Sequence, residues 1–272
     1  METLTLEKET ILNTNTLTQI DNKSWIEQDV LVIILLNKNF DFKASRTPYD
    51  LNICGKKMWE WTALAVGDCE VKTTVCTEES NILTLIKPYL NNKKWTAVLY
   101  SDTPLLSGKT FVEIMEYVRA KQVNVLNLDR GYVFSTEYIK GVDSLLSFNV
   151  THFGSSLDFM VVDSSQKLYD VTTVIKNRIL DYHINNGILI EDKNSTVIDA
   201  DVIIENGTII KQNNCIYGLT YIGKNCVLEP NNVIKDSVIS NNCVVKYSYI
   251  EQSRISENII VGPFESVVNK SN

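Results

Sequence analysis

The sequence has few of the residues on which most enzyme chemistry depends. Histidine occurs only twice in 272 residues, at His152 and His183, and we expect a surface or packing role for each. No set of Ser, His and Asp, no zinc-ligand spacing and no P-loop motif occurs along the chain. These absences argue against a serine hydrolase, a zinc enzyme and a P-loop NTPase.

A basic excess and long hydrophobic runs are also missing. The chain has 26 Lys and Arg against 33 Asp and Glu, a formal net charge of −7, and no dense basic run. We therefore expect neither a nucleic-acid partner nor a membrane-surface partner. The longest apolar run, Val30–Leu36, is far too short to span a bilayer. The first ten residues are polar and acidic, unlike a signal peptide, so we expect a cytoplasmic protein.

Closely spaced cysteine pairs are absent too. The six cysteines include no Cys-x-x-Cys pair, and three of them fall in the last third of the chain. We interpret them as reduced thiols that fill space in the core, rather than as disulfides or metal ligands.

The clearest feature that is present is a six-residue repeat. An aliphatic residue returns at every sixth position, at Ile198, Ile204, Ile210, Ile216, Ile222, Leu228 and Ile234. The spacing then loosens to fives and sixes, at Ile239, Val245, Ile250, Ile255 and Val261. This period matches neither a helix nor an isolated strand, but it suits short strands that turn a corner every six residues. The pattern predicts a β-helix with one aliphatic per repeat in its core, asparagines at its corners, and coils about 4.8 Å apart.

The residues before the repeat alternate between strand-like and helix-like segments. The predicted strands are Val30–Leu36, Val71–Cys76, Thr96–Tyr100, Val123–Leu126, Gly131–Phe134 and Phe159–Val162. The predicted helices are Gly55–Ala65, Glu78–Leu90 with an interruption at Pro88, a helix capped by Ser107 that ends near Lys121, and Asp170–Asn186. The alternation favours a doubly wound, Rossmann-like α/β domain. We predict this domain over residues 1–186, including a linker helix over about 170–186, and the β-helix over residues 187–272.

Two stretches resemble one known family in particular. Thr96–Leu106 resembles a strand that ends in a Gly-Asp-x-Pro-Leu turn, and Asn177–Phe264 resembles a linker helix with the first β-helix coils. A third stretch, Asn127–Phe134, is similar to a sugar-contacting Asn-x-Gly strand. Together they resemble the bacterial bifunctional N-acetylglucosamine-1-phosphate uridyltransferase and glucosamine-1-phosphate acetyltransferase family. The resemblance implies a sugar-1-phosphate nucleotidyltransferase fold and makes the β-helix left-handed.

The resemblance also suggests roles for individual residues. Asp102 matches the Mg²⁺-binding aspartate of the family, although an Asp that closes the Thr-Pro turn is an equal alternative. Asp170 is a second candidate Mg²⁺ ligand by a competing alignment, or the N-cap of its helix. Asn127 and Gly131 match the positions that contact the sugar.

The segment Asn37–Tyr49 departs from the family, whose glycine-rich loop surrounds the nucleotide phosphates with backbone N–H groups. This segment contains no glycine and carries the bulky side chains of Phe40 and Phe42. Its cations Lys38, Lys43 and Arg46 could contact phosphate, with Lys38 and Arg46 as our candidates, or else they belong to a solvated surface.

Another departure concerns the second metal ligand of the family, whose place falls on Lys176. An ammonium group there would repel Mg²⁺ and pair with Asp102. The chain ends at Asn272, before the coils that hold the catalytic His of the family, so we expect no acetyltransferase activity.

Two functions follow as hypotheses. In the first, the protein is a relative of UDP-N-acetylglucosamine pyrophosphorylase with weak or lost activity, which would join a nucleotide to a sugar phosphate using Mg²⁺. In the second, it is a non-catalytic scaffold or a regulatory protein that binds a sugar nucleotide. In both we expect a homo-oligomer, with a trimer favoured by the resemblance, and Tyr217, Tyr221, Tyr247 and Tyr249 are candidates for its contact surface.

Overall fold

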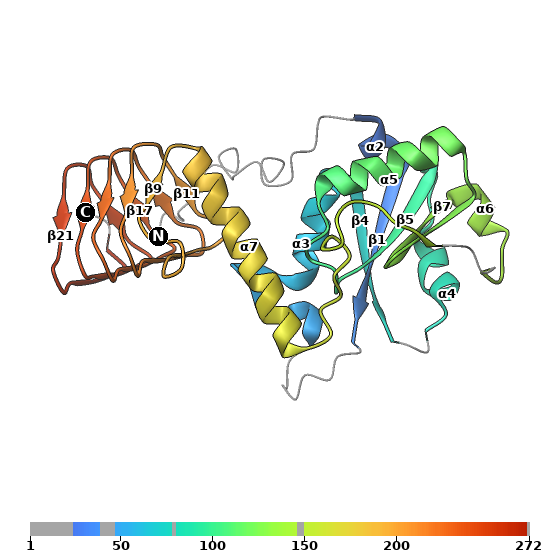
Figure 1. Ribbon diagram of the computed structural model, residues 1–272, viewed down its shortest axis with the longest axis horizontal. Coiled ribbons are helices and arrows are strands. Elements are labelled where there is room, and N and C mark those ends of the chain that lie inside the picture. The colour runs from blue at the N-terminus through green and yellow to red at the C-terminus, as the bar shows by residue number, and fades with distance from the viewer. Residues whose placement is uncertain (1–23, 39–46, 78–79, 146–149, 271–272) are drawn as a thin grey trace. The chain divides into compact units, whose positions relative to one another are not determined.

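The computed structural model describes residues 24–38, 47–77, 80–145 and 150–270 (Figure 1). The described chain forms two compact units, which we call the α/β unit (residues 24–53 and 57–171) and the β-helix unit (residues 54–56 and 172–270). The predicted domain division at residues 186 and 187 stays a prediction. Within the described residues no helix is both long and apolar enough to cross a membrane.

The α/β unit is built on a six-stranded mixed sheet with the order β4-β1-β5-β7-β6-β8. Its strands are β1 (Val30–Asn37), β4 (Glu70–Cys76), β5 (Trp95–Tyr100), β6 (Val125–Leu128), β7 (Gly131–Ser135) and β8 (Val150–Thr151). Strand β1 pairs in parallel with β4 on one side and with β5 on the other, whereas β7 runs antiparallel to both β5 and β6. The continuous apolar run of β1 is buried because helices cover both faces of the sheet. An α/β fold is therefore confirmed, with an antiparallel hairpin added to its parallel strands.

Most helices in the described part of the chain are short, and only α5 (Gly108–Lys121) and α7 (Ser165–Asn185) exceed ten residues. The others are α2 (Ser24–Asp29), α3 (Met58–Ala65), α4 (Ile82–Ile86) and α6 (Thr136–Lys140). Among the described residues, the other elements before the β-helix are two 3₁₀ turns, η2 (Pro48–Asp50) and η3 (Lys87–Tyr89), and two short strands, β2 (Asn52–Ile53) and β3 (Lys56–Lys57). Alternate residues of β1 face two apolar clusters, one with α3 and α5 and the other with α4 and α6. The predicted cap of α5 is confirmed, because Ser107 Oγ accepts the backbone N–H of Thr110 at 3.1 Å.

Three predictions for this region are wrong. Phe159–Val162 is not a strand: its backbone runs as a loop in which Val162 N donates to Asp102 O at 2.8 Å. The apolar pattern of this stretch reflects burial of Phe159 and Val162 in that loop. The predicted helix Glu78–Leu90 is shorter than expected, because among its described residues only Ile82–Ile86 is α-helical and the chain continues as a 3₁₀ turn, Lys87–Tyr89, at the predicted interruption. Asp170 is not an N-cap, because α7 begins five residues earlier, at Ser165.

The β-helix unit consists of short parallel strands in three sheets. One sheet contains β10 (Val197–Ile198), β13 (Cys215–Tyr217), β16 (Val233–Lys235), β19 (Tyr249–Glu251) and β22 (Ser266–Val268). The second contains β11 (Ile203–Ile204), β14 (Tyr221–Ile222), β17 (Val238–Ile239) and β20 (Arg254–Ile255). The third contains β9 (Leu189–Ile190), β12 (Ile209–Ile210), β15 (Val227–Leu228), β18 (Val244–Val245) and β21 (Ile260–Val261). All twelve repeat aliphatics named above are buried. The fold is consistent with the predicted left-handed β-helix.

The corners of the β-helix follow the predicted chemistry. Left-handed backbone occurs at Asn213, Asn225, Asn231, Asn242, Asn258 and Asn269, and asparagine tolerates that conformation better than most residues. Inside one corner, the buried side chain of Asn232 is bonded to the coils on both sides: its Nδ2 donates to Asn214 Oδ1 at 2.9 Å, and its Oδ1 accepts the backbone N–H of Ser248 at 2.8 Å. These bonds satisfy polar groups that would otherwise be buried without partners.

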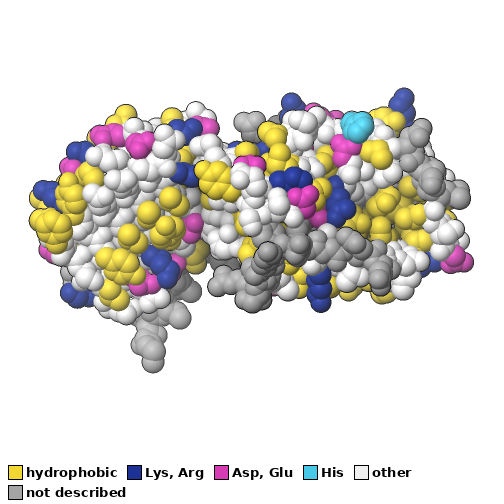
Figure 2. Space-filling model, turned by 60° about the horizontal axis from the view of Figure 1, so that its bottom comes forward, with side chains coloured by type: hydrophobic (Ala, Val, Ile, Leu, Met, Phe, Trp, Pro, Cys, Tyr) yellow, Lys and Arg dark blue, Asp and Glu magenta, His cyan; other side chains and the backbone are white. Residues whose placement is uncertain are grey.

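The outer surface of the β-helix is partly apolar. In Figure 2, hydrophobic side chains gather at the far left end, which is the C-terminal end of the β-helix. Ile260 in β21 and Phe264 just after it are 62% and 83% exposed. Of the four candidate tyrosines, Tyr247 and Tyr249 are exposed, whereas Tyr217 and Tyr221 are half-buried.

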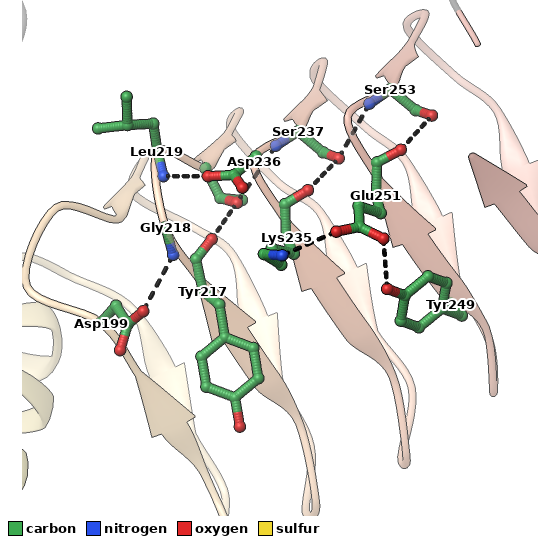
Figure 3. Close-up of polar contacts among 11 residues, drawn as sticks. Asp199, Tyr217, Gly218, Leu219, Lys235, Asp236, Ser237, Tyr249, Glu251 and Ser253 are labelled. Atoms are coloured by element: carbon green, nitrogen blue, oxygen red, sulfur yellow. Dashed lines mark hydrogen bonds and ion pairs between the residues drawn. The ribbon is translucent and has the colours of Figure 1, made fainter. Parts of the chain in front are cut away.

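One edge of the β-helix has polar contacts between successive coils instead (Figure 3). Asp199 and Asp236 accept the backbone N–H groups of Gly218 and Leu219 at 3.0 and 2.9 Å. On the neighbouring strands Lys235 Nζ pairs with Glu251 Oε1 at 2.8 Å. Ser237 Oγ accepts the backbone N–H of Ser253 at 3.1 Å, so here too a side chain of one coil binds the backbone of the next.

Residues 54–56 extend this edge, although they come from far earlier in the chain. Ala200 N donates to Cys54 O at 3.0 Å, as the N–H groups of later coils donate to their neighbours. Lys56 Nζ bonds both carboxylate oxygens of Asp201, at 2.7 and 2.9 Å. Gly55 has φ +89°, and a Cβ there would approach Asp199 to 2.9 Å, so the position requires glycine. The three residues are thus bound tightly to the first coil.

Candidate functional site

A pocket of about 360 Å³ lies at the carboxyl ends of β4, β1 and β5 in the α/β unit. Asn37, Cys76 and Tyr100, the last residues of β1, β4 and β5, are part of its lining. Strands β4 and β5 flank β1 on opposite sides, so the strand order reverses at β1. Open α/β sheets bind ligands at such a reversal, outside the carboxyl ends of the strands. The pocket is therefore our candidate site.

Asp102 is the central charged residue of the pocket and is fully buried. Arg130 binds its carboxylate with two groups: Nη2 donates to Oδ2 at 2.6 Å, and Nε donates to Oδ1 at 3.2 Å. Asn37 Nδ2 donates to Oδ2 at 2.8 Å. A buried carboxylate requires such partners, because an unpaired charge is strongly disfavoured away from water.

Arg130 reaches Asp102 because of the local fold of the chain. It lies with Asp129 in the two-residue turn of the hairpin that joins β6 to β7. The neighbouring Gly131 has φ +134°, and a Cβ there would lie 2.5 Å from the carbonyl oxygen of Val98. Glycine at position 131 thus lets β7 pack closely against β5 and fixes the turn beside the pocket.

The guanidinium of Arg130 is held from a second side. Its Cζ lies 4.0 Å from the ring centroid of Tyr100, a cation–π contact. Burial lowers the pKa of Arg130, but the hydrogen bonds and negative charge of Asp102 outweigh it and raise that pKa above its ordinary value. Burial also raises the pKa of Tyr100 to about 12 and that of Cys76 to about 11. The phenol and the thiol are therefore protonated at neutral pH.

The remaining polar lining is less buried. Asp163 belongs to the loop before α7 and pairs through Oδ2 with Lys167 Nζ at 2.6 Å. Hydrogen bonding to Lys167 lowers the pKa of Asp163, which keeps it ionised. Thr77 and Ser80 contribute hydroxyl groups, which lie 3.1 Å from each other.

The structure places some of the predicted site residues in or beside this pocket. Asp102 lines it, whereas Asp170 lies on α7 and accepts a hydrogen bond from Gln166 Nε2 at 2.9 Å. Asn127 in β6 and Gly131 in β7 stand on either side of the turn that carries Arg130.

The structure does not bring the cations predicted to contact phosphate into the lining of the pocket, as far as they are described. Lys38 is exposed directly after β1, and Arg46 lies outside the described residues, as do Phe40 and Phe42. Lys176 does not pair with Asp102: its Nζ donates to Asn194 O at 2.7 Å. The roles assigned to Lys38, Arg46, Asn127, Gly131 and Asp170 stay predictions.

Sequence reasoning missed Arg130 and Asp163. Arg130 lies inside the stretch Asn127–Phe134 that supported the resemblance, between two residues expected to contact sugar. A basic residue in a tight turn between two apolar strands could have drawn attention to it. Nothing local distinguishes Asp163, because only the path of the loop brings it to the pocket.

The pocket does not fit the Mg²⁺ ion that the resemblance implies. Both oxygens of Asp102 already accept hydrogen bonds from Arg130, and Asp163 is paired with Lys167. A divalent cation at Asp102 would have to displace a guanidinium of like charge. Across the described ranges, no three His, Cys, Asp or Glu side chains come together as metal ligands.

Comparison with known proteins gives a consistent relationship. The chain is 40% identical over 117 residues to "Bifunctional protein GlmU" of Clostridium kluyveri, which covers 41% of this chain and 26% of the relative. It is 38% identical over 162 residues to the GlmU protein of Caldanaerobacter subterraneus subsp. tengcongensis, a match that covers 59% of this chain and 35% of the relative. For the GlmU protein of Clostridium botulinum the identity is 34% over 141 residues, covering 51% and 30%.

These matches confirm that the chain is related to GlmU proteins. Each match spans only about a quarter to a third of the length of the relative. No protein-family model matches the chain.

Proposed function

We propose that this protein is a non-catalytic relative of the sugar-1-phosphate nucleotidyltransferases, which binds a sugar nucleotide but does not transfer a nucleotide. The relationship to GlmU supports the sugar-nucleotide part of the proposal. One observation carries the non-catalytic part: the guanidinium of Arg130 occupies the carboxylate of Asp102.

The physical argument starts from what nucleotidyl transfer demands. The reaction moves a phosphoryl centre between oxygens, so catalysis rests on positioning and on neutralising phosphate charge, chiefly with Mg²⁺. Asp102 is the residue expected to hold that ion. Freeing it would break two charge-assisted hydrogen bonds in a buried site and leave the cation of Arg130 next to Mg²⁺. The Asp102–Arg130 pair therefore favours binding over catalysis.

We further propose that the protein acts as a homo-oligomer in the cytoplasm, with the β-helix as the contact element. The exposed apolar side chains on its last coils, among them Ile260 and Phe264, support self-association. Light scattering should give about three times the 30.9 kDa mass of one chain if the expected trimer forms. A mass of one chain would contradict the oligomer.

The enzymatic part is tested by pyrophosphate release from UTP and N-acetylglucosamine-1-phosphate with Mg²⁺. We expect no turnover above a control without protein. Calorimetric titration with UDP-N-acetylglucosamine should nevertheless show binding. Turnover that disappears in Asp102→Ala would overturn the proposal and restore the nucleotidyltransferase hypothesis.

A further inference from the structure

The third sheet of the β-helix presents an aliphatic side chain to the outside in every strand. Its five strands are in register, so one outward position repeats from coil to coil, while the next residue along each strand points inward. We call the residues at the outward position the aliphatic column: Leu189, Ile209, Val227, Val244 and Ile260. The two ends of the column, Leu189 and Ile260, are exposed, and the residues between them are half-buried.

The corresponding position is not aliphatic throughout in the other two sheets. In the first sheet Tyr249 and Ser266 occupy it in the last two strands. In the second sheet it is occupied by Tyr221 in β14 and by Arg254 in β20. Among the three described sheets, the third therefore has the continuous apolar strip, and such a strip beside charged residues is typical of a protein contact.

A column of alternating charge runs beside the aliphatic column on the same face. Its members stand two residues further along each strand, and their backbone N–H groups bond in register to the next coil. In the order of β9, β12, β15 and β18, the charged column consists of Glu191, Lys211, Glu229 and Lys246. Lys211 Nζ pairs with Glu229 Oε2 at 3.0 Å. Hydrogen bonding to Glu229 raises the pKa of Lys211, and the charge of Glu191 adds to that effect.

This order of charges is complementary to itself when it is reversed. A two-fold axis along the strand direction turns a second copy end over end, so that β9 faces β18 of that copy and β12 faces β15. Glu191 then lies opposite Lys246 of the second copy, and Lys211 lies opposite Glu229. The same rotation places the two aliphatic columns against each other. The fifth strand, β21, has Gly262 in place of a charge and lies beyond this overlap.

Parallel arrangements do not match the two columns in this way. A two-fold axis along the β-helix places each coil against the same coil of the second copy and exchanges the columns, so aliphatic side chains would face charged ones. A three-fold axis joins one face of each copy to a different face of the next copy, so the two charged columns would not meet.

We propose that the third sheet binds a second copy of this chain in antiparallel orientation, about a two-fold axis along its strands. The inference rests on the proposed function, because it identifies the contact surface and the symmetry of the proposed homo-oligomer. It makes that oligomer a dimer, in place of the trimer that the resemblance favours.

The first test is the mass of the full chain by sedimentation equilibrium at high protein concentration. We expect about twice the 30.9 kDa mass of one chain. Glu229→Lys and Lys211→Glu each place like charges opposite each other, so each variant alone should dimerise at least about tenfold more weakly. The control Glu205→Lys reverses a charge beside β11 in the second sheet and should leave the mass unchanged.

An equimolar mixture of Glu229→Lys and Lys211→Glu should form the dimer again, because every charge in the mixed pair faces its opposite. Both variants lack the pair between Lys211 and Glu229 within one chain, so that pair cannot explain the recovery. Recovery also requires that both variants are folded.

Carbodiimide cross-linking of Glu191 to Lys246 tests the orientation. Within one chain these residues stand three coils apart, about 14 Å at the usual strand spacing of about 4.8 Å. A bond without a spacer therefore joins two copies. We expect this cross-link in the dimer of the native chain.

The outcomes for the two proposals are separable. A mass of one chain would contradict both the proposed homo-oligomer and this inference. A mass of three chains would overturn the inference and leave the homo-oligomer standing. So would a dimer that persists in both single variants, or one in which Glu191 and Lys246 are not cross-linked. Turnover is tested separately by pyrophosphate release.

Discussion

The two units of this protein differ in how far apart in the sequence the partners of their buried polar contacts lie. In the β-helix, Asn232 bonds Asn214 and Ser248, which lie 18 and 16 residues away and repeat the same structural position. In the α/β unit, Asp102 bonds Arg130 and Asn37, which lie 28 and 65 residues away in unrelated elements. A repeat makes the neighbours of a residue predictable from its spacing. A functional pocket does not, because each of its residues is brought there by a separate part of the fold.

The strongest way to test this difference is to remove Arg130 from the pocket. Arg130→Met should lower the free energy of unfolding by about 3–5 kcal/mol, because it leaves a buried carboxylate short of a partner. Urea denaturation measures the loss. Lys87→Met is the control, and its exposed pair should contribute at most about 1 kcal/mol. Equal effects of the two variants would show that Asp102 is not buried as described.

The regularity of the β-helix is tested by repeating one change at two equivalent positions. Ile216→Ala and Ile234→Ala each remove a fully buried aliphatic from neighbouring coils of one sheet. Each should cost about 2–5 kcal/mol, from lost burial and the cavity left behind. The two values should agree within about 1 kcal/mol, since the environments repeat. A large disagreement in denaturation experiments would mean that the coils are not equivalent.

A pH titration tests burial at His183 of α7, in the β-helix unit. His183 is 2% exposed, and burial lowers its pKa to about 4. Between about pH 6.5 and pH 4 the unfolded chain takes up this proton and the folded chain does not, so stability falls as pH falls. The loss is at most about 3 kcal/mol, and the group adds no further dependence below pH 4.

The histidine part is isolated by comparing variants at several pH values. His183→Gln should remove this component of the pH dependence, whereas His152→Gln should retain it, because His152 is 80% exposed. Parallel stability curves for the native protein and His183→Gln between pH 7 and pH 4.5 would contradict the assignment.

The smallest expected effect concerns two adjacent lysines. Lys56 and Asp201 are only 16% and 22% exposed, so Lys56→Met should cost about 1–2 kcal/mol. Lys57 pairs with Asp50 where both side chains are about half exposed, so Lys57→Met should cost less stability than Lys56→Met. Thermal unfolding of the two variants tests whether residues 54–56 belong to the first coil. An equal shift would argue that they do not.

The wrongly predicted strand at Phe159–Val162 shows what hydrophobic spacing cannot predict. The apolar character of Phe159 and Val162 predicts a strand, and both side chains are indeed buried. Their backbone forms a loop, however, and Val162 N donates its hydrogen bond to Asp102 O rather than to a neighbouring strand. Apolar spacing records which side chains are buried, but not which backbone groups satisfy each other.

The candidate site shows the same limit. The position of Asp102 at the end of a buried strand could be predicted from Thr96–Leu106, because the strand and its turn are local features. That Arg130, rather than a metal or Lys176, is bonded to Asp102 could not be predicted, because it depends on how the β6–β7 hairpin pairs with β5. The glycine at position 131 is a local sign of that close approach, but it does not identify the partner.

By itself, the sequence determined the β-helix, the central strand β1 and the relationship to GlmU, since each rests on spacing, hydrophobicity or similarity along the chain. The tertiary structure alone decided that Asp102 is held by Arg130 and Asn37, that Asp163 joins the pocket, and that residues 54–56 belong with the β-helix. Burial of an aliphatic side chain follows from its own chemistry. A buried charge is stable only with partners, and the fold selects those partners from distant parts of the chain.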